Sequence, residues 1–400
     1  MKESIFNYHF LINNKEYIFN TNNGGLIEIN PDGFTDEEKN ILYENRFWVE
    51  DQCDEVSELE QEINENIQQA NEDLTLTIAL TYQCNFQCVY CFEDKNNKVM
   101  KKETAQEIID KVEQLLSDYQ YDRLRIHFYG GEPLLNTDVM LYFHERFKKI
   151  AQNAGVQYKP SLTTNGSMLT NELISSINFD TIQLTFDGLE KTHNSLRVSD
   201  VFRFDEQVQL IGKILDHSDT KIRFRINVCR QNRSEVMELY QYITEKYGKK
   251  RIIFIPNRMI KFHEEDQFDM LSIKEYSDVL MEIKDTLSDE YQLPNPERTP
   301  CSFVCGMAYS INTDGYCDFC ETTKAEKNDK FKDIDVRKKK PVSFREECRT
   351  CKCLPICLGG CVVQHNLKAG CCTYEKYHME HIIKTYIDRL SIQPADEHSA

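Results

Sequence analysis

The pattern of apolar and polar residues changes twice along the chain. Residues 1 to about 72 predict a small α+β unit, with short strands at 6–12, 16–20 and 26–29 and polar helices at 35–43 and 55–69. From residue 75 onward, β-like runs alternate with amphipathic segments, of which 103–119 is the clearest helix. After about residue 290, short turns rich in glycine and cysteine dominate until a helix near 374–390.

The middle region predicts a parallel sheet, because strands that alternate with helices pair in parallel. Its β-like runs are 75–82, 123–130, 161–164, 181–187, 222–228 and 252–256. We therefore expect an α/β fold with a partial, TIM-like (β/α)6 barrel, and barrel enzymes carry their chemistry at the C-terminal ends of the strands. The expected domains are an N-terminal domain at 1–72, the barrel at 73–289, a cysteine-rich domain at 290–390 and a tail at 391–400.

Composition and charge narrow the class of protein. Apolar residues make up 40% of the 400 residues, which is enough for a buried core. The net charge of −18 argues against a nucleic-acid partner, which needs a basic surface. No stretch approaches the roughly 18 apolar residues of a membrane helix, and residues 1–10 lack a signal-peptide pattern. We expect a cytoplasmic protein that contacts neither membrane nor nucleic acid.

The cysteines are too many for a cytosolic chain of this size unless they bind metal. The chain has 16 cysteines, with three at 84–91 and most of the others between 301 and 372. Cys84, Cys88 and Cys91 have the spacing C-x3-C-x2-C directly after the first barrel strand. A [4Fe-4S] cluster held by three cysteines leaves one iron open to a small molecule. A zinc site is the alternative, but this loop holds no histidine as a fourth ligand.

With Tyr90 before the third cysteine, the loop resembles that of radical S-adenosylmethionine (SAM) enzymes, and the resemblance covers about residues 75–372. In that family the aromatic residue borders the adenine, and the open iron chelates the methionyl group. One electron from the cluster then cleaves the sulfonium to a 5′-deoxyadenosyl radical, which removes a hydrogen atom from the substrate. In such enzymes the protein positions the reactants and excludes water.

Further motifs follow the next strands. The segment 127–133 resembles the family's GGEP motif, which contacts the amino group of SAM, although such a tetrapeptide alone could be a turn. The segments 163–166 and 185–188 resemble its TNG and S-I-D-G segments, and Asn227 is a weaker candidate. Arg197 matches the arginine that holds the SAM carboxylate, with a surface arginine as the alternative. The resemblance implies cofactor binding by Tyr90, Gly130, Gly131, Glu132, Thr185 and Arg197.

The C-terminal cysteines have the spacings C-x9-G-x4-C from 305 and C-x2-C-x5-C-x3-C from 348, followed by a pair at 371–372. This pattern resembles the SPASM domain of radical SAM enzymes that modify peptides. The resemblance implies two auxiliary [4Fe-4S] clusters, three clusters in all. The first would use Cys301, Cys305, Cys320 and Cys361. The second would use Cys348, Cys351, Cys357 and Cys372, with Cys371 as the alternative to Cys372. A pair of zinc ribbons is the other interpretation.

These resemblances predict an oxidoreductase that matures a ribosomally made precursor peptide, by forming a cysteine thioether crosslink as sactipeptide and ranthipeptide enzymes do. A flavodoxin or ferredoxin would supply the electron. The N-terminal unit either grips a leader peptide by strand addition or acts as a structural cap. The alternative is an anaerobic sulfatase maturase, in which Glu321 would be the general base where relatives have aspartate. A non-catalytic iron–sulfur protein is the alternative from another class.

Overall fold

The computed structural model describes residues 1–70, 73–287, 291–318, 320–323 and 329–392. The chain divides into two compact units, and neither is a continuous stretch of sequence. The first unit comprises Met1–Ile67, Ser272–Pro300 and Pro341–Ala400, and the second comprises Gln68–Leu271 and Cys301–Lys340. This division differs from the linear order of domains expected from the sequence, because each unit takes part of the cysteine-rich region.

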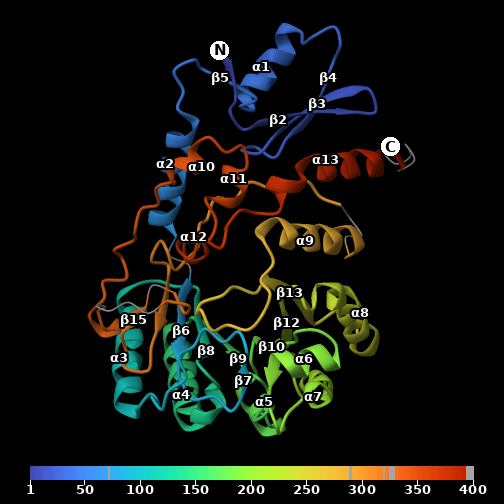
Figure 1. Ribbon diagram of the computed structural model, residues 1–400. Helices are drawn as coiled ribbons and strands as arrows, with labels where there is room; N and C mark the ends of the chain where they lie inside the picture. Colours follow the sequence, from blue (N-terminus) through green and yellow to red (C-terminus); the bar gives the residue numbers. More distant parts are fainter. Residues whose placement is uncertain (71–72, 288–290, 319, 324–328, 393–400) are drawn as a thin grey trace, which may run out of the picture. The chain divides into compact units, whose positions relative to one another are not determined.

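The second unit is built on an eight-stranded sheet of order β13-β12-β10-β9-β8-β6-β14-β15 (Figure 1). Every bonded pair in it is parallel except β14–β15. The strands are β6 (Asp73–Ala79), β8 (Arg123–Tyr129), β9 (Gln157–Thr163), β10 (Thr181–Thr185), β12 (Lys221–Val228), β13 (Ile252–Arg258), β14 (Ala308–Ile311) and β15 (Cys317–Asp318). The first six are the predicted barrel strands, so the α/β prediction with a partial TIM-like core is confirmed.

Helices follow most of the strands of this sheet, and strands such as β8 bury one face. On β8, for example, Leu124, Ile126 and Phe128 are each 0% exposed, while the alternate residues are partly exposed. The buried face belongs to the helix side, because a parallel sheet covers its apolar residues with its crossover helices. The helices are α3 (Lys102–Asp118), α4 (Thr137–Ala154), α5 (Asn171–Ile177), α6 (Glu190–Leu196), α7 (Phe204–His217) and α8 (Val236–Tyr247). The short pair β7 (Gln87–Cys88) and β11 (Arg197–Val198) lies apart from the main sheet.

The start of β9 and the strand β14 are among the departures from the sequence prediction. β9 begins at Gln157 rather than 161, although it contains Pro160. Proline lacks an N–H donor and is rare in central strands, which is why the predicted strand began later. Here the carbonyl of Pro160 still accepts a hydrogen bond from the backbone N–H of Asp180 at 2.8 Å. β14 was not predicted, because its four residues lie in a turn-rich region of the sequence. They form a strand through their parallel pairing with β6.

The first unit contains a three-stranded antiparallel sheet, β2 (Asn7–Ile12), β3 (Lys15–Asn20) and β4 (Leu26–Ile29), in that order. Asn13 and Asn14 both have positive φ, as a two-residue hairpin turn requires. A short pair joins β1 (Lys2–Glu3) to β5 (Trp48–Val49). The helices of this unit are α1 (Asp36–Glu44), α2 (Glu55–Gln69), α9 (Ile273–Leu287), α10 (Glu346–Arg349), α11 (Leu354–Cys357), α12 (Val362–Asn366) and α13 (Glu375–Ile392).

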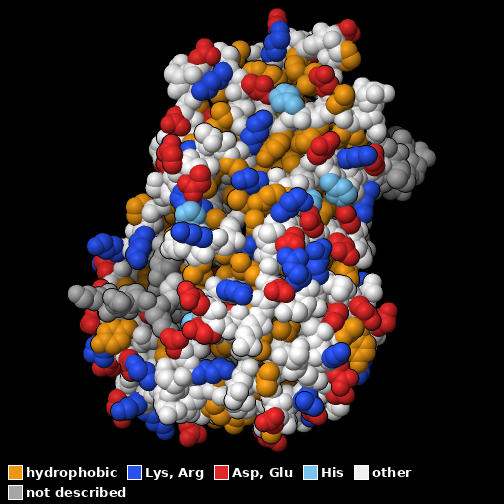
Figure 2. Space-filling model, viewed as in Figure 1, with side chains coloured by type: hydrophobic (Ala, Val, Ile, Leu, Met, Phe, Trp, Pro, Cys, Tyr) orange, Lys and Arg blue, Asp and Glu red, His pale blue; other side chains and the backbone are white. Residues whose placement is uncertain are grey.

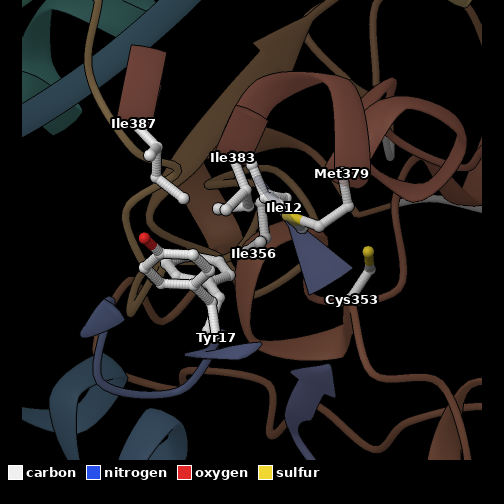
Figure 3. Close-up of a cluster of buried hydrophobic side chains, with 8 residues drawn as sticks. Ile12, Tyr17, Cys353, Ile356, Met379, Ile383 and Ile387 are labelled. Carbon is white, nitrogen blue, oxygen red and sulfur yellow. The ribbon is translucent and has the colours of Figure 1, made fainter. Parts of the chain in front are cut away.

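The N-terminal sheet and the C-terminal helices of the first unit share one core. Figure 3 shows Ile12 and Tyr17 of the sheet gathered with Ile356 of α11 and Ile383 of α13. The hydroxyl of Tyr8 also lies 3.1 Å from the sulfur of Cys353. The N-terminal sheet therefore folds together with the segment that carries Cys351 and Cys353.

Two surface features bear on possible partners. In the described part of the chain, none of the helices has the length and apolar character needed to cross a lipid bilayer. On the face shown in Figure 2, acidic and basic side chains are interspersed among the described residues.

Candidate functional site

The cysteine loop is held against the segment that carries Arg197. β7 pairs antiparallel with β11, so that Cys88 lies opposite Arg197. Next to this pair, the backbone N–H of Val89 donates to the carbonyl of Leu196 at 3.0 Å. The loop also folds on itself, because the backbone N–H of Phe86 donates to the sulfur of Cys84 at 3.4 Å. These contacts place an arginine beside the second cysteine, although 109 positions separate them in the sequence.

The two glycines after β8 allow a close backbone approach to the start of the same loop. A Cβ atom on Gly130 would lie 2.2 Å from the carbonyl oxygen of Thr81, and one on Gly131 would lie 2.3 Å from that of Gln83. Gly130 also has φ +135°, which an L side chain rarely adopts. The N–H of Gly131 donates to Thr81 at 2.9 Å, and that of Glu132 donates to Gln83 at 2.8 Å. Glu132 is therefore fixed beside the residue that precedes the first cysteine.

The carboxylate of Glu132 is fully buried and already accepts three hydrogen bonds. Oε1 accepts from the hydroxyl of Thr164 at 2.7 Å and from the N–H of Leu134 at 3.1 Å, and Oε2 accepts from the N–H of Asn165 at 2.7 Å. Burial raises the pKa of Glu132, and these hydrogen bonds oppose the rise. A carboxylate has about four acceptor positions, so one on Oε2 remains for a further donor such as an ammonium group.

A second buried network joins Tyr90, Asp187 and Arg197. The hydroxyl of Tyr90 donates to Asp187, and the guanidinium of Arg197 donates to the oxygen of Tyr90 at 3.0 Å. Asp187 is 0% exposed and accepts a further bond from the N–H of Asn227 at 2.9 Å. The Nε of Arg197 is buried without a hydrogen-bond partner among the described residues. A buried donor without a partner is unfavourable, so Arg197 suits a ligand that brings an acceptor.

Residues 78–257 match the family model described as the radical SAM superfamily. The chain contains a radical SAM domain. The matched region covers the loop, the Gly-Gly-Glu segment and Arg197, so all the contacts above belong to this domain.

Among curated relatives, a probable GTP 3′,8-cyclase of Methanocella arvoryzae is 25% identical over 213 residues, which are 51% of this chain and 64% of the relative. The mycofactocin maturase MftC of Mycolicibacterium smegmatis is 24% identical over 185 residues, 44% of this chain and 42% of the relative. The chain thus matches less than two thirds of the length of either relative.

Two solved structures share the fold over most of the chain. Native anSMEcpe with bound AdoMet and a Cp18Cys peptide, an anaerobic sulfatase maturase, superposes with a TM-score of 0.63 at 19% identity, over 79% of this chain and 99% of the other. SuiB of Streptococcus suis superposes with a TM-score of 0.55 at 15% identity, over 91% of this chain and 96% of the other. At sequence identities of 19% and 15%, the similarity to these two structures establishes a shared fold only.

The residues of the radical SAM domain fit the group that the family binds, SAM on a [4Fe-4S] cluster. The spare acceptor position of Glu132 and the unpaired Nε of Arg197 suit the ammonium and carboxylate groups of an amino acid. The three thiols lie within electrostatic range of one another, because burial, Cys88 and Cys84 together raise the pKa of Cys91 to about 11. Thr185 ends β10 and is 7% exposed, but no contact distinguishes it as a ligand.

The cysteines of the expected second auxiliary cluster lie together in the first unit. Burial and the neighbouring Cys351, Cys348 and Cys372 together raise the pKa of Cys357 to about 11. Cys371 lies in the same group, because its pKa is raised first by burial and then by Cys372, Cys348 and Cys361. The choice between Cys371 and Cys372 therefore stays open.

The cysteines of the expected first auxiliary cluster are divided. Cys301, Cys305 and Cys320 belong to the second unit, where Cys301 raises the pKa of both others in addition to their burial. Cys361 belongs to the first unit. In the described part of the chain, no group of three or more Cys, His, Asp or Glu side chains already has the geometry of a metal site. The ligand sets therefore stay predictions.

Sequence reasoning missed a polar group on the partly exposed face of the sheet. Burial raises the pKa of Tyr129 well above its usual value, and Glu93, Glu321 and Cys91 raise it further, whereas Arg225 lowers it. Glu321, expected as a general base, therefore lies near Tyr129 and Arg225. In the sequence of β8 and β12, polar residues alternate with apolar ones. This alternation identifies a polar group only once one face of the sheet is known to be buried.

Proposed function

We propose that the protein is a radical SAM maturase that modifies a ribosomally made peptide. The observation that carries the proposal is the convergence of the cysteine loop, Glu132 and Arg197, which are far apart in the sequence. When bound, SAM and the cluster supply a one-electron reductive cleavage that yields an organic radical able to remove hydrogen from a substrate.

The protein's own residues perform the binding and positioning. Glu132 would accept a hydrogen bond from the amino group of SAM, and Arg197 would donate to its carboxylate. Tyr90 keeps the guanidinium of Arg197 in place through their 3.0 Å contact and is itself held by Asp187. Because Glu132, Asp187 and Arg197 are buried, the site keeps water away from these charges and strengthens their interaction with the cofactor.

A peptide substrate is supported by what similar proteins act on. The anSMEcpe structure holds a peptide, another SuiB structure is bound to the precursor peptide SuiA, and MftC is a maturase. We propose that the C-terminal cysteines hold two auxiliary clusters, which would carry electrons away from the oxidised substrate. We propose a thioether crosslink from a substrate cysteine as the product, and a flavodoxin or ferredoxin as the electron donor.

The N-terminal sheet offers a place for a leader peptide. β4 is an edge strand, because the sheet order places it beside β3 alone. A cavity of about 490 Å³ adjoins it, lined by Tyr17, Leu26, Glu28, Leu293, Tyr386 and Leu390 among other residues. An extended peptide could add to this edge and bury side chains in the cavity.

Iron content and SAM cleavage test the proposal. Three [4Fe-4S] clusters correspond to about 12 iron atoms per chain after anaerobic reconstitution. Reduced enzyme should release 5′-deoxyadenosine from SAM, and Cys88→Ala should abolish this release while about eight iron atoms remain. If the wild type binds zinc at the C-terminal cysteines, or releases no 5′-deoxyadenosine, the proposal is wrong.

Leader recognition needs a point substitution rather than a deletion. Removing residues 1–72 would expose the core that Ile12 and Tyr17 form with α13. Leu26→Glu places a charge in the cavity at the edge of the sheet. It should weaken precursor binding and leave SAM cleavage without peptide unchanged. Unchanged precursor binding would favour a purely structural role for the N-terminal sheet.

The second candidate is a sulfatase maturase that oxidises cysteine or serine to formylglycine. Burial raises the pKa of Glu321, and the neighbouring Arg225 and Arg223 oppose the rise, so the carboxylate lies in the partly enclosed interior where a base would be needed. A sulfatase-derived peptide, compared with a cysteine-rich precursor, distinguishes the two: formylglycine formation loses mass from the peptide without joining two residues.

A further inference from the structure

β12 carries two arginines on the face of the sheet opposite the helices. Ile222, Phe224 and Ile226 are 0% exposed on its buried face. Arg223 and Arg225 alternate with them and therefore share the other face. Arg225 pairs in register with Thr185, the last residue of β10, so it lies at the C-terminal end of the barrel strands. Parallel barrels bind substrates at this end.

The two guanidinium groups are poorly compensated by the protein. The side chain of Arg223 makes no hydrogen bond or ion pair with any residue that the structure describes, and it is exposed. Among the described residues, the side chain of Arg225 makes one hydrogen bond, which its Nε donates to the side-chain oxygen of Asn227 at 2.8 Å. The two arginines repel each other, and Glu321 is the carboxylate that attracts both.

His127 lies within electrostatic range of Arg223 and adds no charge of its own. Burial, together with the neighbouring Arg223, lowers the pKa of His127 to about 4, so this histidine is neutral near pH 7. It is held by Ser161 and Thr163 through contacts of 2.9 Å. Glu321 attracts both arginines, whereas Asp187 attracts Arg225 and also Arg197. The three arginines outnumber these two carboxylates, which leaves an excess positive charge in this region of a protein whose net charge is −18.

We infer that Arg223 and Arg225 bind a carboxylate of the peptide substrate and so select substrates with a negative charge near the modified residue. The inference rests on the proposed peptide maturase function. Two guanidinium groups can each donate two parallel hydrogen bonds to a carboxylate, which gives strength and orientation. The carboxylate can come from an acidic side chain or from the C-terminus of the peptide.

Binding can be measured without any chemistry. The probes are three synthetic hexapeptides: Ala-Ala-Glu-Cys-Ala-Ala with both ends blocked, the same peptide with glutamine for glutamate, and the glutamine peptide with a free C-terminal carboxylate. Titrations use the full-length reconstituted protein with SAM and no reductant, so that no turnover occurs. The variants are Arg223→Gln, Arg225→Gln and the double variant. Lys221→Gln is the matched control, because it removes a positive charge from the same face of β12 at its other end.

We expect wild type and Lys221→Gln to bind the glutamate peptide, or the peptide with the free C-terminus, at least tenfold more tightly than the blocked glutamine peptide. Which of the two binds identifies the source of the carboxylate. Each single variant should lose most of this preference and the double variant all of it. Equal binding of the three peptides by the wild type, or a preference that persists in the double variant, would overturn the inference.

Two further measurements distinguish a failure of this inference from a failure of the maturase function on which it rests. Reductive SAM cleavage without peptide should be the same in all variants; a loss of cleavage in the double variant would place the arginines in the cofactor pocket and overturn the inference. A wild type that prefers the acidic peptide yet never modifies a peptide under reduction would instead contradict the maturase function. Thermal unfolding checks that each variant folds.

Discussion

Gly131→Ala tests whether the Gly-Gly-Glu segment is fixed by direct backbone contact with the cysteine loop. The added Cβ would lie 2.3 Å from the carbonyl oxygen of Gln83 and 2.9 Å from that of Tyr82. Ordinary carbon–oxygen contacts are about 3.3 Å or longer. The two segments would therefore have to separate by about 1 Å, a distance set by that contact limit.

That separation removes two hydrogen bonds. The bonds from Gly131 to Thr81 and from Glu132 to Gln83 are 2.9 and 2.8 Å long, and both would lengthen beyond bonding distance. Two lost bonds cost about 2–3 kcal/mol, and the residual overpacking adds about 1–3 kcal/mol. We expect the free energy of unfolding to fall by about 3–6 kcal/mol in all. SAM binding should weaken too, because Glu132 moves with the segment.

Urea unfolding followed by circular dichroism measures the first effect, and calorimetric titration with SAM measures the second. Gly155→Ala is the control for a change at a conformationally special glycine. Gly155 has φ +69° but nothing within 4 Å of its Cβ position, so alanine there should cost only about 1–2 kcal/mol. If Gly131→Ala destabilises the protein no more than Gly155→Ala, the close approach does not exist. Reduced stability with unchanged SAM affinity would mean that the position of Glu132 is unimportant for binding.

Three further predictions concern charge, pH and packing. Glu132→Gln should weaken SAM binding by about tenfold or more in titration calorimetry, because an ammonium group loses a charged acceptor. Burial lowers the pKa of His193 to about 3, whereas an unfolded histidine takes up a proton near 6.5. The contribution of neutral His193 to the free energy of unfolding is therefore fully present above pH 6.5 and decreases by about 2 kcal/mol between pH 7 and pH 5. In urea unfolding, His193→Asn should remove this part of the pH dependence. Ile383→Ala, at a position that is 0% exposed, should cost about 2–5 kcal/mol and make the N-terminal sheet more susceptible to proteolysis.

Each of these predictions has an outcome that contradicts it. Equal SAM affinity in Glu132→Gln would remove the proposed ammonium contact. An unchanged pH slope in His193→Asn would mean that this histidine is not kept neutral by burial. Proteolysis that affects α13 but spares the N-terminal sheet in Ile383→Ala would contradict a shared core.

Much of the fold was predictable because the periodicity of apolar residues and the spacing of motif residues can be read from short segments of the sequence. The alternation at 75–82 and 123–130 and the helical face of 103–119 identify β6, β8 and α3 to within a few residues. The strand containing Pro160 was predicted too short and β14 was missed. In both cases neighbouring strands override a weak local preference, and neighbours cannot be read from a local window.

The candidate site was predictable only as a set of residues. Tyr90, Glu132 and Arg197 were each recognised from a motif. Asp187, which is hydrogen-bonded to Tyr90 and to the backbone of Asn227, was not identified as the residue that joins them. The charges on Arg223 and Arg225 were visible in the sequence, but their shared face near Glu321 was not.

The sequence by itself determined most of the longer strands and helices, and which cysteines lie within reach of one another along the chain. Both follow from residue spacing of a few positions. Only the tertiary structure decided that Arg197 lies opposite Cys88, that two glycines meet the backbone before Cys84, and that the N-terminal sheet shares a core with α13. The reason is physical: these contacts join residues separated by tens to hundreds of positions, and burial of the whole core, rather than any local preference, fixes them.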